Sequence, residues 1–335
     1  MNSPPSRVLV LGGTGFLGRS VVAALNDRLG PEGSVVVAGR TPPEQPFPAT
    51  FIKGDRRRSE FLRVLHSMRF HTWIDLAMYT GLEAQQLVDL FAAGFAPKRL
   101  FVAGSIAEYG LHLRLPLPVA EDAPLRGEGP YARGKIDAWN ALSTGLSGTP
   151  SQLAWGVLPQ MWGPGDPHGR DALWIEQLVQ SAPIVLRGSG RTIMPDGFVQ
   201  TVAKAIVHLA CATSVTGRVN IAGEALVTPL AYLRHAAGAL ETTCRTLHLP
   251  PKEVHRLETL HDFRFRAPFG DSDFALNLER LRESGFRQSI SAPRGFARTA
   301  LWHRDHPTST LSSVVAGLEH LKSGEGILVE VLHVD

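Results

Sequence analysis

Cysteine, aromatic residues and long apolar runs are all scarce in this chain of 335 residues. Its 2 cysteines, Cys211 and Cys244, lie far apart and outside any Cys-x-x-Cys pattern, which argues against a disulfide framework and a zinc site. No apolar run approaches the roughly 20 residues of a membrane span, and the N-terminal residues lack a signal-like pattern. We therefore expect a cytoplasmic protein with no membrane partner and with reduced thiols in its core.

Neither sign of charge is in clear excess. The sequence holds 34 Lys and Arg against 31 Asp and Glu, a net charge of +3. This balance is too even to indicate nucleic-acid binding, although the pI is near 9.0. The length allows one or two domains, and 44% hydrophobic residues is typical of a globular protein with a large core.

What the chain does contain is a glycine-rich turn near its N-terminus. The apolar segment Val8–Leu11 reads as a buried strand, and it runs into the seven residues from Gly12 to Gly18. Gly13-x-Gly15-x-x-Gly18 fits the pyrophosphate-binding pattern, in which glycines permit a tight turn and close approach of the phosphates. The helix that follows, to about Asn26, offers free N–H groups and the positive end of its dipole. The segment predicts a dinucleotide site.

Apolar strands and amphipathic helices alternate along the chain. We expect strands at 34–38, 51–52, 72–77, 99–103, 153–158 and 217–221, and helices at 82–95, 131–146 and 198–212. Residues 163–195 are rich in glycine and proline. The pattern predicts an α/β fold, a Rossmann-type doubly wound parallel sheet with a smaller C-terminal substrate lobe. We expect residues 1–160, with 196–222 returning, to bind the dinucleotide, and 161–195 with 223–335 to form the substrate lobe.

Tyr131 and Lys135 lie four residues apart on one face of a predicted helix. A phenol with a pKa near 10 is a poor base at neutral pH, and a neighbouring ammonium lowers that pKa. Ser105 stands at the end of the fifth predicted strand, at the edge where such sheets bind ligands, and can donate a hydrogen bond to a substrate oxygen. The alternative is an exposed lysine beside a core tyrosine on an ordinary helix.

The second strand ends in Ala38-Gly39-Arg40-Thr41. NAD-binding proteins usually place Asp or Glu here for the ribose 2′-hydroxyl, whereas an arginine can hold a 2′-phosphate and stack on adenine. We therefore predict that NADP(H) is preferred and NAD(H) possible. An arginine that simply faces solvent is the alternative.

The motifs together resemble the extended short-chain dehydrogenase/reductase superfamily, which includes NAD-dependent epimerases and dehydratases. The resemblance covers most of the chain and rests on elements in the family's order. These are the turn from Gly12 to Gly18, Gly54-Asp55, Asp75-Leu76-Ala77, Ser105-Ile-Ala-Glu-Tyr109-Gly110, Tyr131-x-x-x-Lys135 and Trp162-Gly163-Pro164-Gly165-Asp166.

The resemblance implies that Tyr131 is the acid/base, that Lys135 also holds the nicotinamide ribose and that Ser105 orients the reacting oxygen. It implies a homodimer formed through the helices at 82–95 and 131–146. The expected cofactor contacts are Gly12, Gly13, Thr14, Gly15, Phe16, Leu17, Gly18, Arg40, Asp55, Arg56, Leu76, Ala77, Lys135, Leu158, Gln160 and Met161. The expected substrate contacts are Met78, Glu108, Gln160, Trp162 and Phe198.

Some positions depart from the family's pattern. Val157 and Gln160 stand where sugar-nucleotide members usually carry Arg and Asn, and Ile106 and Ala107 stand where dehydratases carry acids. These differences favour an NADP(H)-dependent reductase or dehydrogenase of a small metabolite, with Tyr131 as acid/base. A nucleotide-sugar epimerase with retained cofactor and a non-catalytic NADP-binding sensor or scaffold are the alternatives.

Three further groups are interpreted as structural. We expect Arg56-Arg57-Arg58 to form a solvated face, with contact between Arg56 and the adenine as the alternative. His303 and His306 have a spacing seen in metal sites, but no third ligand is visible, so we expect a surface loop and no metal. The segment 166–170 is either a surface turn or a substrate loop.

Overall fold

The chain divides into two compact units in a computed structural model that describes residues 7–30, 33–43, 47–111, 115–250, 252–254, 256, 272–307 and 328–332. Unit 1 consists of Met1–Pro159, Val199–Ala222 and Leu276–Gln288, and unit 2 consists of Gln160–Phe198, Gly223–Ala275 and Ser289–Asp335. The return of a third segment, residues 276–288, to unit 1 was not expected from the sequence.

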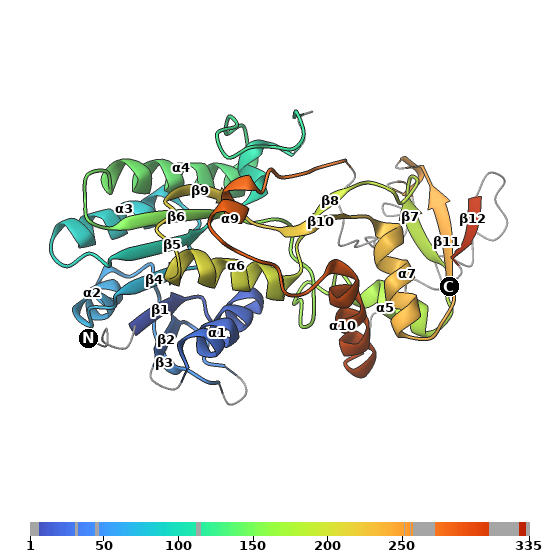
Figure 1. The fold of residues 1–335 in the computed structure, drawn as a ribbon, viewed down its shortest axis with the longest axis horizontal. Coiled ribbons are helices and arrows are strands. Elements are labelled where there is room, and N and C mark those ends of the chain that lie inside the picture. Colours follow the sequence, from blue (N-terminus) through green and yellow to red (C-terminus); the bar gives the residue numbers. More distant parts are fainter. Residues whose placement is uncertain are drawn as a thin grey trace. The chain divides into compact units, whose positions relative to one another are not determined.

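Unit 1 is built on a seven-stranded sheet with the order β3-β2-β1-β4-β5-β6-β9 (Figure 1). Its strands are β1 (Arg7–Leu11), β2 (Ser34–Gly39), β3 (Thr50–Lys53), β4 (Thr72–Asp75), β5 (Arg99–Ala103), β6 (Gln152–Val157) and β9 (Gly217–Asn220). All neighbouring pairs are parallel, so every carboxyl end lies at one edge. The strand order reverses between β1 and β4, where open sheets of this kind bind ligands. The predicted Rossmann-type fold is confirmed.

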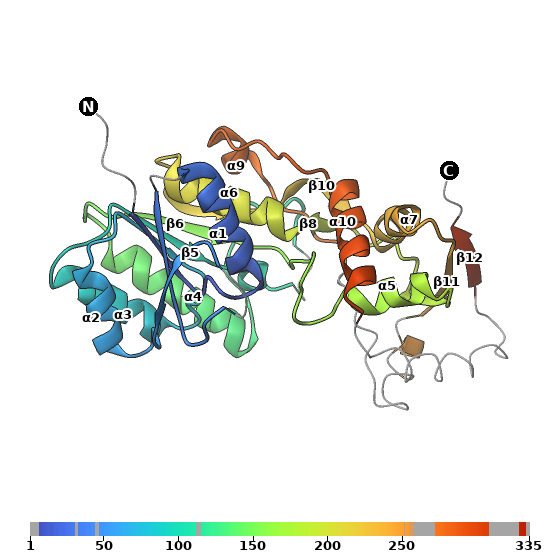
Figure 2. The same cartoon turned by 90° about the horizontal axis from the view of Figure 1, so that it is seen from below.

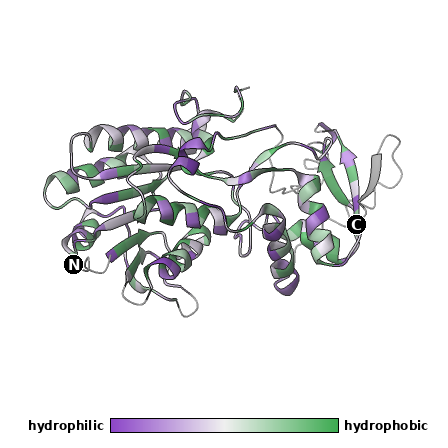
Figure 3. Cartoon of the chain, in the orientation of Figure 1, coloured by the Kyte–Doolittle hydropathy of each residue, from purple (hydrophilic) through white to green (hydrophobic). Residues whose placement is uncertain are grey.

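Helices cover both faces of this sheet, which explains why its strands are apolar. Figure 2 shows α1 (Phe16–Leu29) and α6 (Val199–Cys211) on one face, and α2 (Ser59–Ser67), α3 (Gly81–Ala92) and α4 (Gly129–Gly145) on the other. Figure 3 shows hydrophobic and hydrophilic residues alternating along these helices, as expected for elements with one buried side. No helix in the described part of the chain is both long and apolar enough to span a membrane.

Local signals set where two of these helices begin. Thr80 caps α3, because its Oγ1 accepts from the N–H of Glu83 at 3.2 Å while the Glu83 carboxylate accepts from the N–H of Thr80 at 3.1 Å. Helix α4 begins at Gly129 rather than at Tyr131, because Pro130 fits the first helical turn, where its missing N–H is not needed.

The described part of unit 2 includes two small sheets and the helices α5 (Ala172–Val179), α7 (Pro229–Ala239) and α10 (Ala292–Asp305). Strands β7 (Ile184–Arg187), β11 (Cys244–Leu249) and β12 (Leu328–Leu332) form one sheet, and β8 (Met194–Asp196) pairs with β10 (Gly223–Val227). The sequence did not reveal α5, because this helix lies within the glycine- and proline-rich stretch 163–195; the structure buries it from Ala172 to Leu178.

The third segment of unit 1 joins the sheet through backbone and side-chain contacts. Leu276 forms a β-bridge with Val119, and the N–H of Asn277 donates to the Val119 carbonyl at 2.9 Å. The short helix α9 (Glu279–Glu283) follows, and Arg280 donates to the carbonyl of Thr216, just before β9, at 2.9 Å. These contacts depend on residues distant in sequence, which no local pattern indicates.

Candidate functional site

The glycine turn between β1 and α1 lies at the carboxyl edge of the unit 1 sheet, beside the point where strand order reverses. Gly12 has a φ of +81°, which favours glycine. A Cβ on Gly13 would lie 2.7 Å from the Val37 side chain, and one on Gly18 would lie 2.2 Å from the Gly12 carbonyl oxygen. A Cβ on Gly15 would make only an ordinary contact, 3.6 Å from the Gly12 carbonyl oxygen. The turn therefore has no room for side chains inside and an accessible surface outside.

The first turn of α1 leaves its backbone donors uncapped. Gly15 is the N-cap residue, it has no side chain to accept a hydrogen bond, and the first turn holds no acidic residue. Thr14, Phe16 and Leu17 complete the turn, and the Thr14 carbonyl accepts from Arg19 at 3.0 Å. Free N–H groups at the positive end of a helix dipole bind anions. These residues fit the pyrophosphate of NAD(P).

Two neighbouring loops carry residues expected to meet the adenosine. Arg40 follows β2 and is exposed, and it forms no ion pair among the described residues. The Asp55 carboxylate lies 2.6 Å from the guanidinium of Arg57. This hydrogen bond holds the pKa of Asp55 well below its usual range, and the nearby charge of Arg40 adds to the effect. Arg40 is thus a cation that remains available at this edge.

Arg56 is buried, unlike the rest of the basic cluster. It is 8% exposed, and its guanidinium lies 2.7 Å from an oxygen of Asp75 and 3.4 Å from one of Glu83. The other Asp75 oxygen accepts from the N–H of Ala77 at 2.9 Å. The expectation of a solvated face is therefore wrong for Arg56, although the next two arginines are exposed. We assign Arg56 to supporting the loop after β4 rather than to contacting adenine.

The loop after β4 also presents Tyr79, which the sequence reading missed. Tyr79 is 50% exposed, and its ring centre lies 4.9 Å from the Lys135 Nζ atom and 6.3 Å from the ring centre of Tyr131. Its N–H donates to the Glu83 carboxylate at 2.6 Å. Leu76 and Ala77, on the same loop, are half-buried. Proximity to a strand's carboxyl end was the one local signal for Tyr79.

The structure brings Ser105, Tyr131 and Lys135 together, as the resemblance implied. Lys135 is 2% exposed, and its ammonium donates to the carbonyls of Met78 and Ala103, both at 2.6 Å. Because an ammonium has three N–H donors, one remains for a ribose hydroxyl. Tyr131 is 49% exposed, and its ring centre lies 5.9 Å from the Lys135 Nζ atom.

Burial has a larger effect than any neighbouring charge on the pKa values of Tyr131 and Lys135. Burial raises the pKa of Tyr131 above its usual 10, and a hydrogen bond with the Ser105 side chain partly offsets this. The expected lowering of the Tyr131 pKa by the charge of Lys135 is not found, because burial outweighs the influences that lower this pKa. Burial also lowers the pKa of Lys135 from 10.5 to about 8, and the charge of Glu108 is the strongest influence that opposes this fall.

The expected substrate contacts are mostly interior residues. In unit 1, Met78 and Glu108 expose none of their surface. In unit 2, Trp162 and Phe198 are 1% and 0% exposed, and their ring centres lie 4.9 Å apart. These four side chains have no free surface for a substrate in this structure, and they act as packing or support. The prediction overlooked burial because all four lie next to loops at strand ends.

The residues expected near the nicotinamide are divided between the units. Leu158 follows β6 in unit 1, and its carbonyl accepts from the N–H of Ile106 at 2.9 Å. Gln160 and Met161 belong to unit 2 and are half-buried.

The two histidines of unit 2 differ: His306 is exposed and lies just past the end of α10, whereas His303 is not in a surface loop. His303 lies in α10 and is 2% exposed, and burial lowers its pKa to about 4. Among the residues that the structure describes, no group of three or more His, Cys, Asp or Glu could hold a metal ion. Asp166 is also buried and lies 2.8 Å from Arg170, so the segment 166–170 is fixed by its own ion pair.

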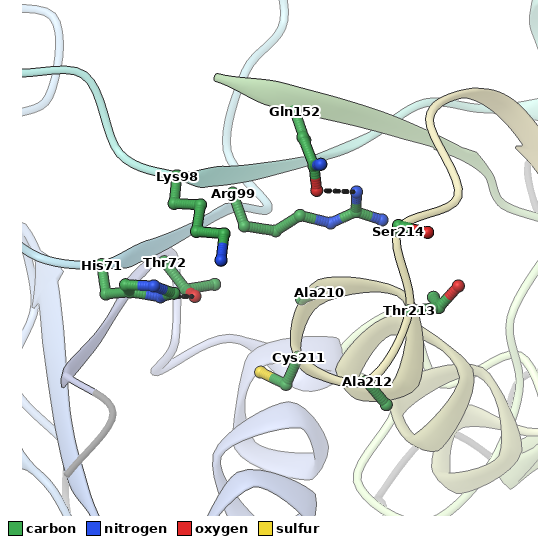
Figure 4. Close-up of a pocket in the computed structure, with 10 residues that line it drawn as sticks. All are labelled: His71, Thr72, Lys98, Arg99, Gln152, Ala210, Cys211, Ala212, Thr213 and Ser214. Atoms are coloured by element: carbon green, nitrogen blue, oxygen red, sulfur yellow. Dashed lines mark hydrogen bonds between the residues drawn. The ribbon is translucent and has the colours of Figure 1, made fainter. Parts of the chain in front are cut away.

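A separate pocket of about 320 Å³ opens at the amino edge of the sheet, where β4, β5 and β6 begin (Figure 4). The guanidinium of Arg99, at this pocket, is 4% exposed and donates to the carbonyls of Leu209, at 2.7 Å, and Val215. Arg99 therefore caps the C-terminal carbonyls of α6. The strands run from this edge toward Ser105, so the pocket is not part of the site above.

Comparisons with known proteins agree with this geometry. The NAD dependent epimerase/dehydratase family matches residues 8–222. A dTDP-6-deoxy-L-talose 4-dehydrogenase (NAD(P)(+)) from Kitasatospora kifunensis is 32% identical over 126 residues, which span 33% of this chain and 38% of that protein. The chain thus matches well under half the length of this curated relative.

Solved structures share the fold at low sequence identity. A UDP-glucose 4-epimerase from Thermotoga maritima, solved with UDP-glucose, is 17% identical with a TM-score of 0.69, over 90% of this chain and 99% of that one. A dTDP-glucose 4,6-dehydratase from Bacillus anthracis, solved with NAD, is 17% identical with a TM-score of 0.69, over 90% and 97%. With the family match over residues 8–222, the chain belongs to the NAD dependent epimerase/dehydratase family of extended short-chain dehydrogenase/reductase enzymes.

Proposed function

We propose that this enzyme is an NADP(H)-dependent oxidoreductase that reduces a ketone, or oxidises an alcohol, of a small metabolite. The observation that carries the proposal is the grouping of Ser105, Tyr131 and Lys135 at the carboxyl edge of the sheet. The nicotinamide, when bound, supplies or accepts the hydride. The protein must then deliver or remove one proton at the reacting oxygen.

Each residue of the group has a role that its surroundings support. Tyr131 is half-exposed, so its phenol can reach a substrate and donate a proton to the reacting oxygen during reduction. The Ser105 Oγ accepts from the N–H of Ala107 at 3.2 Å, and its O–H, which hydrogen-bonds to Tyr131 in this structure, can turn to orient that same oxygen. Lys135 keeps one N–H for the ribose and ties the loop after β4 to the end of β5.

The preference for NADP(H) rests on Arg40. This side chain is exposed, unpaired with any carboxylate of the described residues, and next to the glycine turn. The position that reads a ribose 2′-hydroxyl in NAD-binding proteins thus carries a cation. A guanidinium pairs with a 2′-phosphate through two parallel hydrogen bonds.

The similarity to a dTDP-6-deoxy-L-talose 4-dehydrogenase supports net reduction or oxidation. The alternative is an epimerase with a retained cofactor, and the fold shared with UDP-glucose 4-epimerases supports it.

We also propose a homodimer through α3 and α4, because Leu82 on α3 is 73% exposed. Gel filtration with light scattering tests the dimer, and a monomeric mass would contradict it.

Two experiments test the catalytic proposal. Tyr131→Phe should reduce kcat by roughly 100- to 10,000-fold while NADPH binding changes little, because only the proton-transfer group is lost. Purified enzyme should consume NADPH in proportion to a carbonyl substrate. Full activity of the variant would place the acid/base elsewhere. Interconversion of two nucleotide-sugar epimers without added cofactor would instead establish the epimerase.

The cofactor preference has its own test and control. Arg40→Ala should weaken NADPH binding by roughly 10-fold or more, and NADH binding much less, because a charge-assisted contact to the 2′-phosphate is lost. Arg63→Ala removes an exposed arginine from α2 and should leave both affinities unchanged. Equal affinities for NADH and NADPH in the unmodified enzyme would rule out the preference.

A further inference from the structure

A completely buried carboxylate lies directly beneath the catalytic serine. Glu108 belongs to the short helix η1 (Ile106–Tyr109) and exposes none of its surface. A buried carboxylate is costly unless donors surround it. One of its oxygens accepts from the N–H of Ser105 at 2.7 Å, and the Trp155 indole donates to both oxygens at 3.1 and 3.2 Å.

A buried arginine completes the set of donors. Arg218 of β9 is 7% exposed, and its Nη2 atom lies 3.4 Å from the Glu108 carboxylate. Its other terminal nitrogen donates to the Glu121 carbonyl at 2.9 Å, and its guanidinium carbon lies 4.8 Å from the ring centre of Tyr109. Glu108 therefore links η1 to two strands of the sheet, β6 and β9.

The donors around Glu108 indicate that it is ionised. The Ser105 N–H, the Trp155 indole and the Arg218 guanidinium can donate but cannot accept, so a proton on the carboxyl group would face donors only. Burial raises the pKa of Glu108, whereas these three groups and the charge of Lys135 lower it. The contacts thus favour a carboxylate with a fixed charge rather than a proton donor.

Glu108 holds Ser105 from the backbone side. The N–H of Ser105 is bound by the carboxylate, while the Ser105 hydroxyl accepts from the N–H of Ala107, so the two bonds form a capping box. Both bonds restrict the orientation of the serine side chain. The serine O–H that remains is directed by this arrangement and not by a flexible loop.

The residue before the serine leaves room for this contact. A Cβ on Gly104 would lie 2.1 Å from the Trp155 indole nitrogen and 2.7 Å from a Glu108 carboxylate oxygen. Any other residue at this position would separate the indole from the carboxylate. Gly104 is therefore part of the same arrangement, although it is itself buried.

We propose that Glu108 is a positioning residue: its carboxylate binds the N–H of Ser105, two residues after the Ala103 carbonyl that holds the Lys135 ammonium, so that it fixes the Ser105 hydroxyl for catalysis and supports the charge of Lys135. This inference rests on the proposed oxidoreductase function. No substrate contact is involved, which distinguishes it from the role that the sequence suggested for Glu108. The variant Glu108→Gln keeps nearly the same shape and packing but removes the charge. Its effects therefore report the charge and the orientation that Glu108 provides, and not its packing.

The first experiment needs no substrate and therefore stands apart from the proposed function. In Glu108→Gln, the Lys135 pKa should fall below about 8, because its strongest favourable charge is lost. The pH dependence of urea unfolding, compared with and without Lys135→Met, reports this pKa. Glu60→Gln, which removes an exposed carboxylate on α2, should not move it. An unchanged Lys135 pKa in Glu108→Gln would overturn the electrostatic part of the proposal.

The second experiment is a double-mutant cycle with the serine. Glu108→Gln should lower kcat by roughly 10- to 100-fold with little change in the KM for NADPH, because misplacement of the serine affects the chemical step. In a Ser105→Ala background the same change should have almost no further effect on kcat. Additive losses would show that Glu108 does not act through Ser105. If wild-type enzyme shows no nicotinamide-dependent turnover, the proposed function fails, and the substrate-free experiment still decides the charge effect.

Discussion

Replacement of Lys135 by methionine tests the central electrostatic feature of the site. The ammonium is 2% exposed, and its two bonds to the carbonyls of Met78 and Ala103 do not outweigh burial, which lowers its pKa from 10.5 to about 8. One pKa unit corresponds to about 1.4 kcal/mol, so the fall represents roughly 3 kcal/mol of folding free energy that depends on pH. Methionine has a similar length and cannot titrate.

The sign of the pH effect follows from proton binding. Between about pH 8 and 10.5 the unfolded chain keeps the lysine proton, whereas the folded protein has lost it. Stability therefore rises with pH in this window. Relative to Lys135→Met, the wild type should gain up to roughly 3 kcal/mol between those limits, and the difference between the two proteins should be constant below the folded pKa.

Urea unfolding followed by tryptophan fluorescence measures this difference at about pH 7, 8, 9 and 10. Lys98→Met is the matched control, because it removes an exposed lysine next to β5. The control should show the same pH dependence as the wild type. If the stability of the wild type relative to Lys135→Met did not change above pH 8, the inference that burial lowers the pKa of Lys135 would be refuted.

Three further predictions concern buried groups outside the catalytic trio. Trp162→Ala should lower the free energy of unfolding by about 3–5 kcal/mol, measured by urea unfolding, because the indole is 1% exposed in an aromatic cluster. Arg56→Met should cost about 3–5 kcal/mol in the same assay, because it leaves the buried Asp75 carboxylate unpaired, and a loss below 1 kcal/mol would contradict the assigned support role. Burial raises the pKa of Asp171 to about 7, so the folded protein retains a proton that the unfolded chain loses near pH 4. Wild-type stability relative to Asp171→Asn should therefore fall as pH rises to about 7. Thermal unfolding at pH 5 and 8 measures this fall, and an equal stability difference at both pH values would contradict the raised pKa.

The seven-stranded sheet was largely predictable because its signals are local. Runs such as Val8–Leu11 need no partner to identify them as buried strands, and Arg99–Ala103 was placed at its observed bounds. The glycine turn was predictable for the same reason, because the need for glycine at positions 12 and 18 comes from backbone geometry within a few residues. In unit 2, α5 was not predicted, because it lies within the glycine- and proline-rich stretch 163–195, whose breakers mask a short helix.

Within the site, the sequence by itself determined which chemical groups are present, since Tyr131 and Lys135 lie one helical turn apart and Ser105 ends a strand. Only the tertiary structure decided how those groups behave. Burial depends on residues distant in the chain, and it turns Arg56 inward, encloses Glu108 with donors from β6 and β9, and lowers the pKa of Lys135. Side-chain charge is written in the sequence, but its desolvation and its partners are properties of the folded chain.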